Sequence, residues 1–292
     1  MIASFSDIIN LVEGREKRVV IPHGGRKGIL EAAKKARESG MIKLILVGER
    51  GKMEEELDFL DMSGDGIQLV EEEEKGEAVN QSIRMIQEGS ADLLMQGNTE
   101  TKVFLDMISR YGLVKGNLLS YVSLFESGGK LLFLTDTYIN DAPDISMKIE
   151  IVRNAIELGS KLGMERLKIA ALSPIEYINP AIPSTVDSAV LAKMSERGQI
   201  SALIEGPLDF DAACSKAAAN SKGVDSIVPG EADVFLFPEI ESAYAFSQFL
   251  IFLFKIRMAG VLIGTSVPVI LDNRIYTSEM KVLNIALGVL SC

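Results

Sequence analysis

The sequence has few of the residues that would indicate particular kinds of site. It contains no tryptophan, only one histidine, His23, and two cysteines, Cys214 and Cys292. This cysteine usage argues against a disulfide framework, and no spacing among Cys, His and carboxylates suits zinc, so we expect no metal and a reducing, cytoplasmic location. The first residues lack an apolar run flanked by basic ones, so we predict no signal peptide.

Basic residues are also in the minority. The chain has 30 Lys and Arg against 41 Asp and Glu, giving a net charge of −11 and a pI near 4.8. Such a chain has no overall attraction for the phosphates of nucleic acid or for an anionic membrane, so we expect neither as a partner. An anionic small-molecule substrate would need a local basic pocket.

A long apolar run free of charge is missing too. Residues 245–264, AFSQFLIFLFKIRMAGVLIG, are numerous enough to span a bilayer, but Lys255 and Arg257 lie at their middle. The pattern changes along this stretch from a helical to a strand-like one. We therefore predict a buried helix followed by a core strand.

The sequence does contain a regular alternation of strand-like and helix-like segments, which is typical of an α/β fold. A Gly-rich turn at 23–28 follows the first strand; it lacks the spacing of a P-loop, so we interpret it as a tight turn. One hairpin, 118–125 and 130–135 joined through Ser127-Gly128-Gly129, interrupts the alternation. With 292 residues, two α/β lobes are expected: residues 1–138 plus 262–292, and residues 139–261.

One stretch near the C-terminus combines a buried strand with a basic side chain. The apolar run Val267–Leu271 stops at Asp272-Asn273-Arg274, and a capped helix is predicted to begin near Thr277. An arginine at the carboxyl end of a strand, beside a helix N-terminus, favours phosphate or carboxylate. A surface arginine with a local ion pair is the alternative interpretation. The segment 97–101, GNTET, repeats the strand-end arrangement.

Three pieces of the chain, in a fixed order, resemble one family. They are LLFLTDTYINDAP at 131–143, NPAIPSTVDSAVLAKMSERGQI at 179–200 running into EGPLDFDAACSKAA at 205–218, and PGEADVFLFPEIES at 229–242 followed by AGVLIGTSVPVILDNR at 259–274. Over about positions 90–290 the chain resembles the phosphate acetyl/butyryltransferases, and it is closer to the butyryl branch.

The resemblance implies a two-lobe α/β/α fold like that of isopropylmalate dehydrogenases, with a cleft between the lobes and usually a homodimer. It implies reversible transfer of a short, possibly branched, acyl group between coenzyme A and inorganic phosphate, without a metal and with coenzyme A as substrate rather than cofactor. The implied catalytic residues are Arg274, which would contact the phosphate end, Asn273 and, as the base, Glu279. The implied substrate-binding residues are Thr101, Ser120, Asp136 and Asn140.

The chain also departs from the family pattern at expected site positions. Asn273 stands where the family has serine, and the acidic base of the family falls on Met280, one residue from Glu279. Gln96 and Tyr121 replace a lysine and a histidine. These departures leave open an inactive family member that binds coenzyme A, acyl-CoA or a phosphorylated metabolite. A metal-dependent dehydrogenase would need an aspartate cluster; the tight group is Asp136, Asp141 and Asp144, which we interpret as charge at a helix N-terminus.

Overall fold

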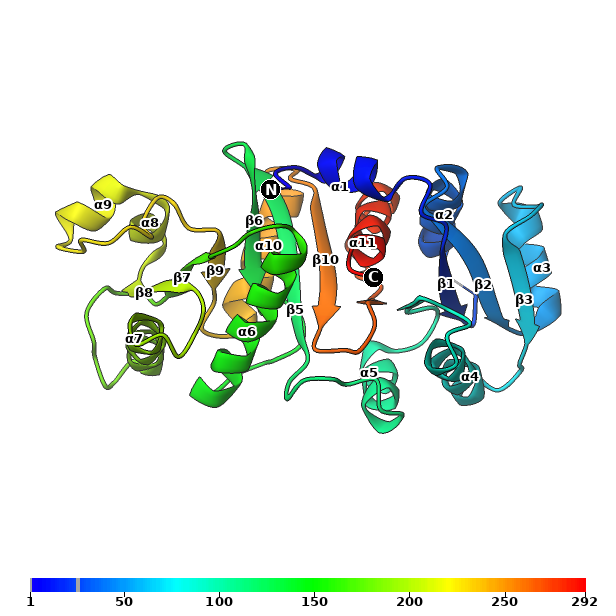
Figure 1. The fold of residues 1–292 in the computed structure, drawn as a ribbon, viewed down its shortest axis with the longest axis horizontal. Helices are drawn as coiled ribbons and strands as arrows, with labels where there is room; N and C mark the ends of the chain where they lie inside the picture. The colour runs from blue at the N-terminus through cyan, green and yellow to red at the C-terminus, as the bar shows by residue number, and fades with distance from the viewer. Residues whose placement is uncertain (1, 25–26) are drawn as a thin grey trace. The chain divides into compact units, whose positions relative to one another are not determined.

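The computed structural model describes residues 2–24 and 27–292, so Gly25 and Arg26 of the predicted turn at 23–28 lie outside the described residues. The chain forms two compact units (Figure 1). We call Phe5–Asn117 together with Met258–Cys292 the terminal unit. Leu118–Arg257 together with residues 2–4 is the central unit.

The terminal unit is built on a mixed sheet in the order β3-β2-β1-β4-β11-β10, in which only β10 runs antiparallel to its neighbour. Because β11 pairs with β4, the C-terminal strand returns to the first part of the chain, as predicted. The elements are α1 (Phe5–Val12), β1 (Lys17–Pro22), α2 (Lys27–Glu38), β2 (Ile42–Gly48), α3 (Arg50–Phe59), β3 (Ile67–Glu71), α4 (Lys75–Gln87), β4 (Leu93–Met95), α5 (Thr101–Arg110), β10 (Met258–Ile263), β11 (Val269–Ile270) and α11 (Ser278–Leu290).

Helices cover the strands of the terminal unit. Helix α2 packs against α11, and α11 packs against α1, whereas α4 packs on β1 and β2 and contacts α5. Helix α2 connects β1 to β2 in one direction along the sheet, and α4 connects β3 to β4 in the opposite direction. Because both crossovers are right-handed, α2 and α4 lie on opposite faces of the sheet. Residues 19–22 of β1 and all of β4 are consequently buried on both faces, which explains the apolar sequences VVIP and LLM.

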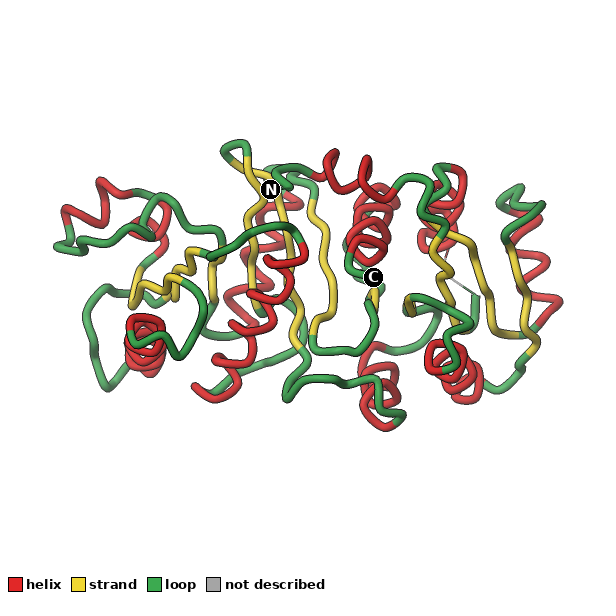
Figure 2. The backbone as a smooth tube through the Cα atoms, in the orientation of Figure 1, coloured by secondary structure: helices red, strands yellow, loops and turns green. Residues whose placement is uncertain are grey.

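The strands of the central unit follow the order β5-β6-β9-β7-β8 and run parallel except for the β5–β6 pair. Figure 2 draws the strands in yellow. Helix α7 packs on β7 and β8, and α6 packs on β5 and β6. The elements are β5 (Ser120–Ser127), β6 (Lys130–Thr135), α6 (Ile145–Lys161), β7 (Lys168–Leu172), α7 (Pro183–Glu196), β8 (Leu203–Leu208), α8 (Phe210–Cys214), α9 (Lys216–Ser221), β9 (Val234–Leu236) and α10 (Ile240–Phe252).

The predicted hairpin is confirmed, since β5 and β6 pair antiparallel with Ser127 opposite Lys130. Gly128 and Gly129 adopt φ values of 59° and 78°, the left-handed conformations that a two-residue hairpin turn requires. The division into compact units falls at 117/118 and 257/258, because β5 belongs with its partner β6. The predicted lobe boundaries at 138/139 and 261/262 lie at other residues and stay a prediction.

The apolar stretch 245–264 contains the C-terminal part of α10 and all of β10, so the predicted change from helix to strand is confirmed. The strand is buried as predicted, but the helix is only partly buried, because Phe249 and Phe252 lie on its exposed face. Across the residues that the structure describes, no helix has both the length and the apolar character needed to cross a membrane.

Candidate active site

The polar residues of the terminal unit gather at the carboxyl ends of β4 and β11. Gln96 follows β4 and is 2% exposed. Its Oε1 accepts a hydrogen bond from the Asp272 backbone N–H at 3.0 Å, and its Nε2 donates to the Thr101 hydroxyl at 3.2 Å. Gln96 therefore joins Thr101, the first residue of α5, to the loop that carries Asn273 and Arg274.

Close backbone packing sets the position of this strand end. At Gly97, a Cβ atom would lie 1.8 Å from the carbonyl oxygen of Pro22 and 2.6 Å from that of Gly24. No side chain fits at that distance from two carbonyl groups. Glycine is thus required for the end of β4 to pass beside the end of β1.

The loop after β11 contains a buried ion pair. Asp272 accepts a hydrogen bond from the Lys281 ammonium group of α11, and the two side chains are only 2% and 8% exposed. Removing one partner of an ion pair that is buried away from water is costly, because water cannot take the place of the lost charge. The pair ties the start of the loop to α11, directly before Asn273 and Arg274.

Asn273 and Arg274 have different surroundings in this loop. Asn273 is 5% exposed, and its Oδ1 accepts a hydrogen bond from the backbone N–H of Ile275 at 3.3 Å. Arg274 is exposed, and within residues 2–24 and 27–292 no carboxylate forms an ion pair with it. The alternative interpretation, a surface arginine with a local ion pair, is therefore not supported by the described part of the chain.

Glu279 and Met280 are adjacent in the first turn of α11, but their side chains have different exposure. Thr277 caps the helix, as predicted, and its hydroxyl accepts from the Met280 backbone N–H at 3.3 Å. Glu279 is exposed, whereas the Met280 side chain is buried at 5% exposure. Neighbouring helical residues point about 100° apart, so the two positions cannot replace each other in direction. In the described residues no hydrogen bond or ion pair links Glu279 to Asn273 or Arg274.

The central unit holds a second polar group, at the end of β6. Asp136 is 4% exposed. Its Oδ1 accepts hydrogen bonds from the backbone N–H groups of Tyr138 at 2.9 Å and Ile139 at 3.1 Å, and its Oδ2 accepts from Asn140 Nδ2 at 2.5 Å. Burial raises the pKa of Asp136 from 3.8 to about 6, and these hydrogen bonds limit the rise because they stabilise the charged form.

Asn140 connects Asp136 to the neighbourhood of Ser120. Its Nδ2 also donates to the carbonyl oxygen of Leu119 at 2.9 Å. Ser120 itself is fully buried, and its hydroxyl accepts from Asn154 Nδ2 at 2.9 Å. The structure therefore brings Ser120, Asp136 and Asn140 together in the central unit.

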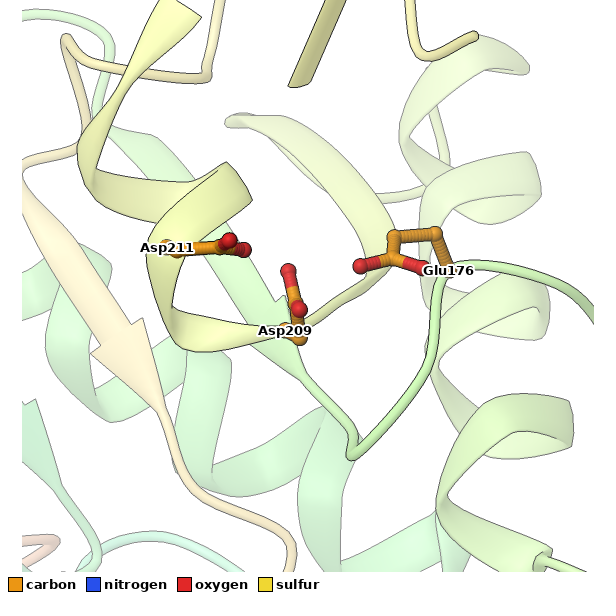
Figure 3. A group of neighbouring side chains, drawn as sticks. All are labelled: Glu176, Asp209 and Asp211. Carbon is orange, nitrogen blue, oxygen red and sulfur yellow. The ribbon is translucent and has the colours of Figure 1, made fainter. Parts of the chain in front are cut away.

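The aspartates considered for a metal do not form a group. Asp144 caps α6 by accepting from the Met147 N–H at 2.9 Å, which confirms the helix N-terminal interpretation for that residue. Among the described residues, the carboxylates close enough to hold a cation are those of Glu176, Asp209 and Asp211, within 4.8 Å of one another (Figure 3).

The side chain of Lys222 already forms ion pairs with these three carboxylates. The Lys222 ammonium group contacts Glu176 at 2.6 Å and Asp211 at 2.5 Å, and it also contacts Asp209. The hydrogen bonds to the carboxylates raise the pKa of Lys222 and lower that of Glu176. Figure 3 shows the carboxylates of Asp209 and Glu176 turned toward the space that the three share. The cluster is an ion-pair network.

Two residues that hold the site of the terminal unit together, Gln96 and Lys281, are not predicted as site residues from the sequence. Gln96 was noted only as a replacement, and Lys281 was not singled out. Lys281 could have been found from composition, because it is a charged residue within MKVLNIALGVL, an otherwise almost wholly apolar stretch of α11. A charge there is either buried with a partner or expensive.

Comparison with solved structures defines the class of protein. A branched-chain phosphotransacylase from Enterococcus faecalis matches with a TM-score of 0.81 and 27% identity, over 94% of this chain and 98% of that one. A phosphotransacetylase from Streptococcus pyogenes, at 19% identity and a TM-score of 0.81, shares the fold over 98% of this chain and 97% of its own. The α/β class predicted from the sequence is thereby confirmed.

Sequence comparison then gives the family. The profile of the phosphate acetyl/butyryl transferase family matches residues 4–83 and 75–289. Phosphate butyryltransferase of Clostridium acetobutylicum is 36% identical over 99% of this chain and 98% of its own, and phosphate acetyltransferase of Thermotoga maritima is 29% identical over 96% and 97%. The chain belongs to the phosphate acetyl/butyryl transferase family, and the resemblance inferred from the three sequence pieces is confirmed.

Proposed function

We propose that the protein catalyses reversible transfer of a butyryl or similarly short branched acyl group between coenzyme A and inorganic phosphate. Membership of the phosphate acyltransferases supports the reaction. Support for the acyl group comes from the 36% identity to phosphate butyryltransferases and from the likeness to a branched-chain phosphotransacylase. Transfer requires the thiolate of coenzyme A to attack the carbonyl carbon of the acyl phosphate while phosphate leaves.

Arg274 is the residue whose surroundings carry this proposal, because it is exposed and no carboxylate of the described residues pairs with it. A guanidinium group binds two phosphate oxygens through paired, charge-assisted hydrogen bonds, and it stabilises the charge that develops on departing phosphate. The ion pair between Asp272 and Lys281 fixes the residue before Asn273, so the arginine is presented on an anchored loop. Among the residues that the structure describes, Arg274 has no ion pair that phosphate binding would break.

Asn273 and Glu279 have separate roles in the proposed reaction. With Oδ1 engaged by the backbone of Ile275, the Nδ2 group of Asn273 can donate to the carbonyl oxygen of the acyl group as negative charge grows on it. It cannot relay a proton as a serine hydroxyl would. Glu279 is proposed as the base that receives the thiol proton, in place of the carboxylate that Met280 lacks.

Thr101, Asp136 and Asn140 are proposed to contact the substrates, and Ser120, which is fully buried, is proposed to support them. Thr101 offers a hydroxyl group oriented by Gln96. Asp136 and Asn140 offer a hydrogen-bonded pair, and Ser120 supports their neighbourhood through its bond with Asn154. None of these groups requires a metal.

An inactive family member that binds coenzyme A or an acyl-CoA is the second candidate. The buried Met280 favours it, because the carboxylate of the family pattern is replaced there by an apolar side chain packed in the core. Such a protein would keep the phosphate contact of Arg274 and lose the transfer.

The experiment that separates the two candidates is a thiol-release assay with phosphate and a panel of acetyl-, propionyl-, butyryl- and isobutyryl-CoA, accompanied by a calorimetric titration with coenzyme A. Phosphate-dependent release that is fastest with butyryl- or isobutyryl-CoA supports the transferase. Binding of coenzyme A without release supports the inactive member and contradicts the transferase. Glu279→Gln, with the exposed Glu165→Gln as control, tests the proposed base.

We also propose a homodimer in the cytoplasm. Helix α10 and the residues after it expose apolar side chains, among them Phe249 at 48%, Phe252 at 53% and Phe254 at 58%. Exposed apolar area of this kind is characteristic of surfaces covered by another chain. Sedimentation of the wild type and of Phe252→Asp checks the dimer: a mass of one chain in the wild type refutes it.

A further inference from the structure

The side chain of Gln96 continues the hydrogen bonding between β4 and β11 beyond the ends of both strands. The ladder ends with Ile270 opposite Met95, and the Gln96 backbone N–H donates to the Ile270 carbonyl oxygen at 2.8 Å. Two residues further on, the Asp272 backbone N–H donates to Gln96 Oε1 at 3.0 Å, where a parallel ladder would use a backbone carbonyl. One amide side chain therefore prolongs the direction of β11 into the loop of Arg274.

Each hydrogen bond of this amide has a fixed direction. A backbone N–H can only donate, so the atom that faces Asp272 is the Oε1 oxygen. The Nε2 group lies 2.8 Å from the carbonyl oxygen of Thr99, which can only accept, and 3.2 Å from the Thr101 hydroxyl oxygen. The two N–H bonds of Gln96 Nε2 are thus both used, one on each oxygen, in a side chain that is 2% exposed.

The Thr101 hydroxyl group consequently keeps its proton available for a ligand. Its oxygen accepts from Gln96, and among residues 2–24 and 27–292 its own O–H donates to no other group. Thr101 is half-buried and is the first residue of α5, whose N-cap residue Glu100 makes no capping hydrogen bond. The positive end of the α5 dipole acts in the same direction as this O–H, so the ligand atom that suits the position is an anionic oxygen.

The other end of the link is the turn that carries Arg274. The turn closes around this residue, because the Tyr276 backbone N–H donates to the Asn273 carbonyl oxygen at 3.1 Å. It begins at Asp272, whose side chain is held by Lys281 and whose backbone is held by the amide. The direction of the backbone at the start of the turn sets where the guanidinium group can reach.

We infer that Gln96 is a positioning residue of the proposed transfer, which presents the Thr101 O–H and the Arg274 guanidinium group to the same phosphate. The inference rests on the proposed function, because it takes phosphate as the ligand. Gln96 itself is buried and acts only through these two residues. The lysine of the family pattern could not replace it, since an ammonium group donates but cannot accept the Asp272 N–H.

Thiol-release kinetics of Gln96→Met, with butyryl-CoA and phosphate, test the inference. Methionine keeps the approximate length of the side chain and removes the amide. We expect kcat/KM for phosphate to fall by about 10- to 100-fold, because a small displacement of a positioned group has an effect of this order, while KM for butyryl-CoA stays near the wild-type value. Gln87→Met is the matched control: this exposed glutamine of α4 also donates to a backbone carbonyl, that of Tyr111 at 2.7 Å.

Binding of inorganic phosphate alone separates this inference from the proposed transfer. The rise in melting temperature on addition of phosphate measures that binding without an acyl-CoA, and it should be smaller for Gln96→Met than for Gln87→Met. If the wild type binds phosphate but releases no thiol, the transfer is refuted and this comparison decides the inference. If the wild type releases thiol and the two variants behave alike, the transfer is supported and the inference is refuted.

The pair Thr101→Ser and Thr101→Val tests the direction of the hydroxyl bond without relying on the folding of Gln96→Met. Thr101→Ser keeps the hydroxyl group and should keep the KM for phosphate. Thr101→Val should raise it by about tenfold, the effect of one hydrogen bond to a charged group. In the Gln96→Met background the change to valine should have a smaller effect, because the amide no longer orients the hydroxyl group.

Four results would overturn the inference. They are equal kcat/KM for phosphate in Gln96→Met and Gln87→Met, a rise in KM for butyryl-CoA as large as that for phosphate, equal KM for phosphate in Thr101→Val and Thr101→Ser, or a wild type that phosphate affects in neither assay. The second result would mean that Gln96 has only a general structural role.

Discussion

The ion pair between Asp272 and Lys281 offers a sharp test of how the loop bearing Arg274 is held. In Lys281→Met the side chain keeps its approximate length but loses the charge that pairs with Asp272. Both side chains are almost inaccessible, at 2% and 8% exposure, so water cannot replace the ammonium group. Breaking one half of such a pair costs about 3–5 kcal/mol of unfolding free energy.

The matched control is Lys43→Met, in the same unit. Lys43 pairs with Glu16 at 2.6 Å, but the two side chains are 49% and 57% exposed. Solvent screens that pair, so its loss should cost about 0–1 kcal/mol. The comparison of the two variants isolates burial, because the chemical change is the same.

Urea unfolding at neutral pH measures both variants, and Asp272→Asn/Lys281→Met completes the comparison. If the cost comes from the loss of the Lys281 charge beside the buried Asp272 carboxylate, the double variant should be more stable than Lys281→Met alone, with a coupling energy of at least about 1.5 kcal/mol. The reasoning is refuted if Lys281→Met and Lys43→Met lose the same stability within about 0.5 kcal/mol.

Three further predictions concern other parts of the chain. Because the pKa of Asp136 is raised from 3.8 to about 6, protonation of its carboxyl group stabilises the folded protein; this contribution is complete below about pH 4 and is lost as the pH rises through 6. The unfolding free energy of Asp136→Asn should therefore gain about 3 kcal/mol relative to that of the wild type between pH 4 and 7. A difference in unfolding free energy that stays constant across this pH range would contradict the prediction. Gly97→Ala should destabilise the protein by about 3 kcal/mol, because its Cβ would overlap the Pro22 carbonyl. Gly51→Ala, in α3 with open space around it, should stabilise the protein by up to about 1 kcal/mol. Similar melting temperatures for the two variants would refute the predicted difference between the two sites. Lys222→Met should lower the melting temperature at pH 7 and do so less at acid pH, where the three carboxylates are protonated; an unchanged melting temperature at pH 7 would show that the network contributes nothing.

Local patterns in the sequence were sufficient for much of the fold. The hairpin was predictable because paired glycines between two strand-like runs permit few other structures, and β5 and β6 pair around them. The start of α11 was predictable from Thr277, since a threonine before an apolar helical stretch is a capping signal. The strand β11 was found, although only Val269–Ile270 of the predicted run forms the ladder.

The connections within the candidate site were not predictable in this way. Gln96 and Asp272 are 176 residues apart, and their hydrogen bond exists because β11 inserts beside β4. Spacing along the chain carries no signal for such a contact. The sequence could place a polar residue at the end of each strand, but only the sheet order shows which strand ends are neighbours.

The direction in which each side chain leaves α11 explains why the proposed base is Glu279 and not Met280. The acidic base of the family falls on Met280, one residue from Glu279, and α11 buries Met280 and exposes Glu279. The helix packs its apolar face against β10 and α2, and Met280 belongs to that face. The exposure of Glu279 could be read only after the helix had been placed on its sheet.

The most direct test of the central claim compares Arg274→Ala with wild type in the thiol-release assay, with butyryl-CoA and phosphate as substrates. Arg84→Ala, at an exposed arginine on α4 in the same unit, is the control. We predict phosphate-dependent release by wild type and by Arg84→Ala, and a loss of about two to four orders of magnitude in kcat/KM for Arg274→Ala, because two charge-assisted hydrogen bonds to phosphate disappear. Equal rates in all three proteins, or no release by wild type, would contradict the account.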